Sequence, residues 1–107
     1  MTTHTADRTE TIREARFLLT SVASMLESEI TNCTKTGRSA RNAEYLGNTS
    51  IALYTCMLTL SSLNDERLEN VLEYIETTRM HLDERAYSLV DALNATNYLR
   101  ELLFAAQ

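Results

Sequence analysis

The sequence predicts an all-α protein, folded as an antiparallel three- to four-helix bundle with a long third helix. Two observations come from composition: the 107 residues include no proline and only two glycines, and they are rich in leucine, glutamate, alanine and arginine, which favour helices. A strand-rich domain of this size needs a turn about every eight to twelve residues, and glycine and proline supply many of those turns. One domain is expected from the length.

The third observation is a hydrophobic seam in the second half of the chain. Its members are spaced 4, 3, 4, 3, 4, 3 and 4 residues apart, which is a heptad repeat. Because no glycine or proline interrupts residues 65–93, one helix of about 44 Å is predicted. Arg79, the charged member, is expected either to pair with Glu76 and Asp83 or to specify the alignment of a partner helix. The seam consists of Leu68, Leu72, Ile75, Arg79, Leu82, Ala86, Leu89 and Leu93.

The remaining elements follow from breaks in the hydrophobic pattern. Residues 1–7 are polar and rich in threonine, so a flexible N-terminal tail is predicted before a single bundle domain, 8–107. Gly37 is the expected left-handed turn residue after the first helix. Helix-breaking polar residues at 94–97 are expected to separate the long helix from a short last one. The predicted helices cover about residues 8–33, 39–61, 65–93 and 97–106.

The second predicted helix has an unusually broad apolar face, made of two adjoining rows. One row consists of Ala43, Leu46, Ser50, Leu53, Met57 and Leu60, and the other of Gly47, Ile51, Tyr54 and Leu58. Such a width predicts a central helix with two neighbours. Glycine in mid-helix costs up to about 1 kcal/mol relative to alanine, so Gly47 is expected to allow close packing, the alternative being a small pocket beside it.

Charge and cysteine content narrow the classes of function. A net charge of −5 argues against nucleic-acid binding, which needs a clustered basic surface. The most apolar run, residues 51–60, is half the length of a membrane span, and residues 1–7 lack the pattern of a signal peptide, so a cytoplasmic protein without membrane contact is expected. Cys33 and Cys56 are expected to be buried thiols, because an antiparallel hairpin would hold them too far apart for a disulfide.

Two sets of residues are candidates for an interaction site. The far end of the long helix would overhang the first two helices, so a partner or a second copy is expected to cover it, and a homodimer is predicted. This candidate interaction face consists of Arg79, Leu82, Ala86, Leu89, Leu93, Leu102 and Leu103. A stripe of acids beside the seam is interpreted either as a solvated flank or as an edge for a basic partner helix. This acidic edge consists of Glu66, Glu69, Glu73, Glu76 and Asp83.

These features predict a non-enzymatic helical module for protein–protein interaction, one that associates with itself. The alternative is a small acidic secretion or export chaperone that shelters an amphipathic helix of a client. A remote alternative is a metal-dependent enzyme that uses the glutamate stripe. Bundle di-iron sites need Glu-x-x-His, and His81 has Thr78 three residues before it, so no catalytic residue, metal ligand or cofactor is assigned.

Overall fold

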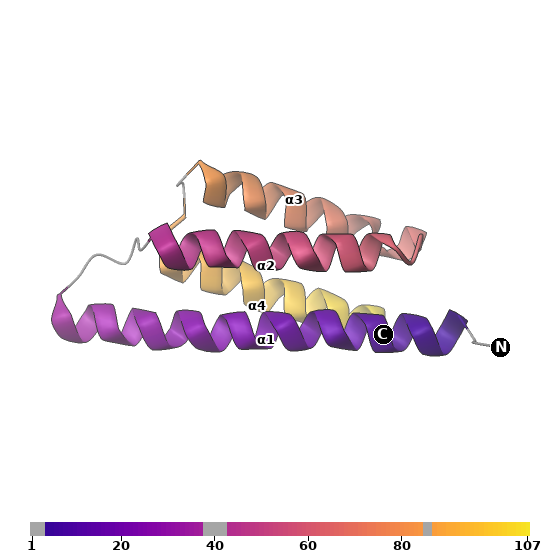
Figure 1. Cartoon of the computed structure of the whole chain (residues 1–107), viewed down its shortest axis with the longest axis horizontal. Helices are drawn as coiled ribbons and strands as arrows, with labels where there is room; N and C mark the ends of the chain where they lie inside the picture. The colour runs from indigo at the N-terminus through magenta and orange to yellow at the C-terminus, as the bar shows by residue number, and fades with distance from the viewer. Residues whose placement is uncertain (1–3, 38–42, 85–86) are drawn as a thin grey trace.

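The computed structural model describes residues 4–37, 43–84 and 87–107, and the side chains of residues 8–37, 44–84 and 87–107. Within these ranges the chain forms four α helices and one 3₁₀ turn: α1 (His4–Thr36), α2 (Ala43–Ser61), η1 (Glu66–Leu68), α3 (Glu69–Asp83) and α4 (Leu89–Ala106). Successive helices run in opposite directions in an elongated bundle of 54 × 23 × 19 Å (Figure 1). The predicted all-α bundle is confirmed.

The helices pair in a way that encloses one core. α1 packs along α2 and α4, and α3 packs along the same two helices (Figure 1). Each helix turns a row of apolar residues inward at helical spacing, as expected for an amphipathic bundle helix. The fully buried side chains include Ile12, Leu19 and Leu26 of α1, Leu53 and Leu60 of α2, Ile75 of α3, and Leu89, Leu99 and Leu103 of α4.

The prediction of one long helix over residues 65–93 is wrong. One helix, α3, ends at Asp83, and a separate helix, α4, begins at Leu89. Ser88 and Asp91 explain the restart. The Ser88 hydroxyl accepts a hydrogen bond from the Asp91 amide at 3.3 Å, and the Asp91 carboxylate accepts one from the Ser88 amide at 3.0 Å. This capping box satisfies two amides at a new helix start. The break lets α4 fold back along α1.

The predicted weak point at residues 94–97 lies inside α4, so the last helix begins earlier than expected. Thr96 is buried there, and its hydroxyl donates to the carbonyl of Ala92 at 2.8 Å. The Arg100 guanidinium donates to the side chain of Asn97 at 2.9 Å. These polar side chains find partners within the helix and therefore do not end it.

The start of α1 differs from the prediction, whereas the turn after its end agrees with it. α1 begins at His4, so residues 4–7 are helical and not part of a tail, whereas residues 1–3 lie outside the described chain. Gly37 follows the helix with a φ of 70°, which confirms its predicted left-handed conformation. The predicted start of the second helix, at about residue 39, falls in the undescribed residues 38–42.

Both cysteines are buried thiols, as predicted. The Cys56 thiol lies 3.8 Å from the carbonyl oxygen of Ala15, between α2 and α1. Burial raises the pKa of Cys56 to about 11. The thiol is therefore protonated at neutral pH and acts as a small packing residue.

Candidate interaction site

The candidate interaction face predicted from the seam is largely the interior of the bundle. Leu82, Leu89 and Leu103 are at most 4% exposed, and Leu93 and Leu102 pack, half-buried, against the core. Ala86 lies outside the described residues. These residues are buried because the helix is interrupted before Ser88. The second half of the seam therefore lies in α4, which packs on α1 of the same chain. The overhang from which a homodimer was predicted is therefore covered within one chain.

An apolar row lies open on α2 instead. Ile51, Tyr54 and Leu58 are 66%, 43% and 53% exposed, and they are spaced three and four residues apart on one side of the helix. Gly47 lies one turn before Ile51 in the same row, and a Cβ atom added there would have no heavy atom within 4 Å. The predicted close packing at Gly47 is therefore wrong. We call Gly47, Ile51, Tyr54 and Leu58 the apolar stripe.

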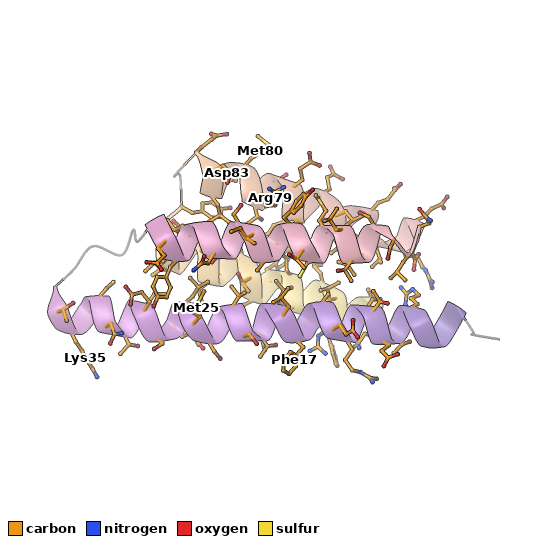
Figure 2. The ribbon with its side chains drawn as sticks, in the orientation of Figure 1. Phe17, Met25, Lys35, Arg79, Met80 and Asp83 are labelled. Atoms are coloured by element: carbon orange, nitrogen blue, oxygen red, sulfur yellow. The ribbon has the colours of Figure 1, made fainter. Side chains whose placement is uncertain are left out.

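Two contacts from α3 place the apolar stripe at the α2–α3 junction. The Arg79 guanidinium lies over the Tyr54 ring, 4.6 Å from its centroid. The Ser50 hydroxyl donates to the Asp83 carboxylate at 3.2 Å. Figure 2 shows Arg79 between the two helices and Met80 pointing away from the bundle. In the part of the chain described, Arg79 forms no ion pair with Glu76 or Asp83, so its predicted local pairing is replaced by a cation–π contact.

The acidic edge is exposed along its whole length. Its residues are Glu66 of η1 and Glu69, Glu73, Glu76 and Asp83 of α3. Asp83 contacts α2 through Ser50, and Glu76 and Glu69 lie on the same side of α3, two and four turns earlier. Asp83, Glu76 and Glu69 of the acidic edge therefore border the apolar stripe. We call the apolar stripe and the acidic edge together the docking face.

The acidic edge does not gather its carboxylates at one point. Across the described residues, no group of three or more His, Cys, Asp or Glu side chains is close enough to hold a metal ion. His81, the histidine nearest the edge, stacks on the Tyr87 ring with centroids 5.0 Å apart. Neither observation supplies a catalytic arrangement for the remote enzyme alternative.

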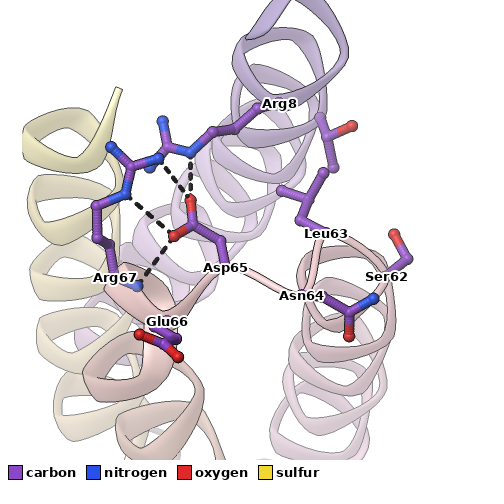
Figure 3. Close-up of a pocket in the computed structure, with 8 residues that line it drawn as sticks. Arg8, Ser62, Leu63, Asn64, Asp65, Glu66 and Arg67 are labelled. Atoms are coloured by element: carbon purple, nitrogen blue, oxygen red, sulfur yellow. Dashed lines mark hydrogen bonds and ion pairs between the residues drawn. The ribbon is translucent and has the colours of Figure 1, made fainter. Parts of the chain in front are cut away.

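A second charged cluster, which sequence reasoning missed, closes the turn between α2 and α3 (Figure 3). The Asp65 carboxylate accepts hydrogen bonds from the Arg67 amide at 2.9 Å and from the Arg67 guanidinium at 3.1 Å, and also from Arg8 of α1. The hydrogen bonds from Arg67 and Arg8 hold the pKa of Asp65 well below its usual value. Arg8 and Asp65 are 57 residues apart, so only the capping role of Asp65 had a local signal.

This cluster ties three elements together and borders a hollow of about 850 Å³ that Thr11, Leu63 and Asn64 also line. Both guanidiniums already face the Asp65 carboxylate. The arrangement therefore fixes the register of α1 against the start of α3, and the carboxylates of Asp65 and Glu66 together balance the charge of the two guanidiniums that line the hollow. We assign it a structural role.

The two phenylalanines, which are also exposed, stand singly. Phe17 is 74% exposed on α1 and points away from the bundle (Figure 2). Phe104 is 65% exposed on α4, with the Arg16 guanidinium 4.9 Å from its ring centroid. Polar residues flank Phe17 along its helix, including Arg13 and Ser21. Single exposed apolar residues are ordinary on protein surfaces, whereas a row of them calls for an explanation.

Comparison of the chain with protein-family models, curated proteins and solved structures found no match. In the part of the chain that the structure describes, none of the helices combines the length and the apolar character that crossing a membrane requires. The docking face is thus the feature from which a function is argued.

Proposed function

We propose that this chain is a non-enzymatic protein–protein interaction module that acts by helix-on-helix packing at the docking face. The observation that carries the proposal is the row of three large apolar side chains on the exterior of α2, at the spacing of one helix side. A rigid helix that presents such a row is the usual partner of an amphipathic helix.

The apolar stripe alone contributes a weak driving force for binding. Full burial of a large apolar side chain contributes about 1.5–3 kcal/mol, so covering three side chains that are already about half covered contributes roughly 1 kcal/mol each. Binding must also offset the loss of translational and rotational freedom. The apolar stripe therefore needs additional contacts from its border, which the acidic edge can supply.

Self-association is one form that this interaction could take. It was predicted from an overhanging seam, and that seam is covered inside the chain. The sequence of α2 contains no lysine or arginine, so the apolar stripe of a second copy would bring no cation from its own helix to the acidic edge. These features favour a different protein as the partner.

One observation favours the second candidate, a chaperone for an amphipathic client helix. The apolar stripe is open in the isolated chain, as expected for a protein that shelters clients transiently. A chaperone would bind several unrelated amphipathic helices with similar affinity, whereas a dedicated module would prefer one. Competition among helical peptides of different sequence for the docking face separates the two candidates.

The test is affinity capture from the native host with the full chain as bait. The variant carries Ile51→Ser and Leu58→Ser, and the matched control carries Phe17→Ser, which removes an equally exposed apolar side chain from α1. We expect a protein that the wild type and the control retain and the double variant loses. Identical captured sets for the wild type and the double variant, or no captured protein at all, would contradict the proposal.

A further inference from the structure

We infer that the docking face binds an amphipathic helix of another protein that carries its lysine or arginine residues along one flank. This inference rests on the proposed function and adds the chemistry of the partner. It is argued from the charges that border the apolar stripe, from a hollow at one end of the docking face, and from the lengths of the two rows.

The borders of the apolar stripe are chemically unequal. On the α3 side run the exposed carboxylates of the acidic edge, and the positive charge between them and the stripe is Arg79, whose guanidinium lies over the Tyr54 ring. On the opposite side, α2 exposes Asn48 and Thr55, which are polar and uncharged. Glu44 lies on that same side at the start of α2, one turn before Asn48, so a partner helix meets a row of carboxylates on one flank and a single carboxylate on the other. Complementary charges opposite the row of carboxylates would raise the association rate and fix the orientation of the partner.

A shallow hollow marks one end of the docking face. It encloses about 280 Å³, with Leu60 and Leu72 among the apolar residues that line it and Glu66 and Glu69 among the charged ones. Lysine and arginine side chains combine an aliphatic stem with a charged tip. The hollow has the matching chemistry, since apolar walls can contact the stem while the carboxylates receive the tip.

The lengths of the two rows define how much of a partner helix can be bound. From Gly47 to Leu58 the apolar stripe extends about 16 Å, and from Glu69 to Asp83 the acidic edge extends about 21 Å, at 1.5 Å per residue. Three to four turns of a partner helix cover both rows. Its apolar residues would recur at three- and four-residue spacing, with basic residues on the flank that faces α3.

The test uses the full chain and three synthetic peptides of about 18 residues, roughly five helical turns. The first has leucines in one row and lysines on one flank. The second replaces each lysine with glutamate, and the third contains the residues of the first in an order without helical periodicity. Fluorescence anisotropy at about 50 mM and about 500 mM salt measures the affinity, because screening weakens contacts between exposed charges.

A charge variant and a matched control identify the surface that is used. The variant carries Glu69→Gln, Glu73→Gln and Glu76→Gln, and the control carries Glu10→Gln, Glu14→Gln and Glu27→Gln on the exposed side of α1, with the same change in net charge. We expect the first peptide to bind, and its affinity to fall about tenfold in the variant, as three exposed charge pairs would account for. The control should lose less than about twofold, since its charges lie far from the docking face.

Three results would overturn the inference: no binding of the basic amphipathic peptide, equal binding by the charge variant, or equal binding of the peptide without periodicity. The stripe variant with Ile51→Ser and Leu58→Ser distinguishes this failure from failure of the proposed function. If that variant loses captured partners while the charge variant keeps them, the docking face binds a partner that is not basic. If intact mass measurement shows a dimer that the stripe variant abolishes, a second copy occupies the docking face, and the inference fails while the proposed function stands.

Discussion

The two apolar rows of α2 differ in what covers them. The inner row includes Leu46, Leu53 and Leu60, which are at most 6% exposed, whereas Ile51 and Leu58 of the outer row are more than half exposed. Both rows belong to the same helix and have similar composition. The difference shows that hydrophobic periodicity measures the width of an apolar face, and that the arrangement of the other helices decides how much of it the chain itself buries.

The arrangement of α4 accounts for the uncovered row. α4 folds back along α1, and α3 follows the edge of α2, so the described elements cover the inner row from α1 and α3 and leave the outer row free. If α3 had continued to residue 93, as the heptad seam predicts, the apolar residues of its second half would have been exposed. Because the helix ends at Asp83, the apolar residues of the seam that the structure describes pack inside the bundle, and the exposed apolar row is the one on α2.

The largest expected effect separates the two rows directly. Leu53→Ala leaves a cavity in the core and should lower the free energy of unfolding by about 2–5 kcal/mol. Leu58→Ala truncates a leucine of the outer row in the same way and should change the free energy of unfolding by less than about 0.5 kcal/mol. Urea denaturation followed by circular dichroism measures both. If Leu58→Ala were as costly as Leu53→Ala, the outer row would be covered in solution, and the comparison would fail.

The next effect tests the cause of the break. Ser88→Ala removes the hydroxyl that caps α4 and should lower the free energy of unfolding by about 1 kcal/mol. Ser28→Ala is the control, because Ser28 is exposed within α1 and alanine is the better helix former there. Equal stability of the two variants in urea denaturation would show that the capping box does not determine where α4 starts.

Local chemistry made part of this fold predictable. The helical class, the left-handed Gly37 and the buried thiols follow from composition and spacing, and each is confirmed. The break was missed because the heptad seam and the capping box between Ser88 and Asp91 give opposite signals. The prediction rested on the periodicity alone and did not use the serine–aspartate spacing, which is visible in the sequence.

The sequence predicted the residues of the candidate site, both the acidic edge and the apolar row of α2, but not the exposure of that row. The exposed acidic edge follows from residue spacing along α3. The exposure of Ile51 depends on which helix packs where, and that is a property of the whole bundle. The contact between Arg8 and Asp65 joins residues 57 positions apart, so no local pattern could indicate it.

Gly47→Ala tests whether the outer row of α2 is uncovered at its first residue. No atom lies within 4 Å of an added Cβ, and alanine is a better helix former, so the free energy of unfolding should rise by up to about 1 kcal/mol. Gly37→Ala is the opposite case, because its φ of 70° strains any residue with a Cβ, and it should destabilise the chain. Thermal melts of both variants measure the pair. A destabilised Gly47→Ala would mean that another backbone approaches α2 closely in solution.

The smallest expected effect concerns the ion pairs of Asp65 with Arg8 and Arg67, which fix the register of α1 against the start of α3. Arg67 and Arg8 lower the pKa of Asp65 in the folded chain. The carboxylate therefore contributes stability above the unfolded-state pKa, near 4, and this contribution is lost as the pH falls through that value toward the lower folded-state pKa. Asp65→Asn keeps a capping side chain but removes the charge. The stability gap between wild type and variant in urea should be small, because Arg67 is largely exposed and solvent screens its ion pair with Asp65, and the gap should close between about pH 5 and pH 2. A gap that persists unchanged at acidic pH would show that Asp65 acts through its cap alone. The ion pairs would then contribute nothing to the register of α1 against the start of α3.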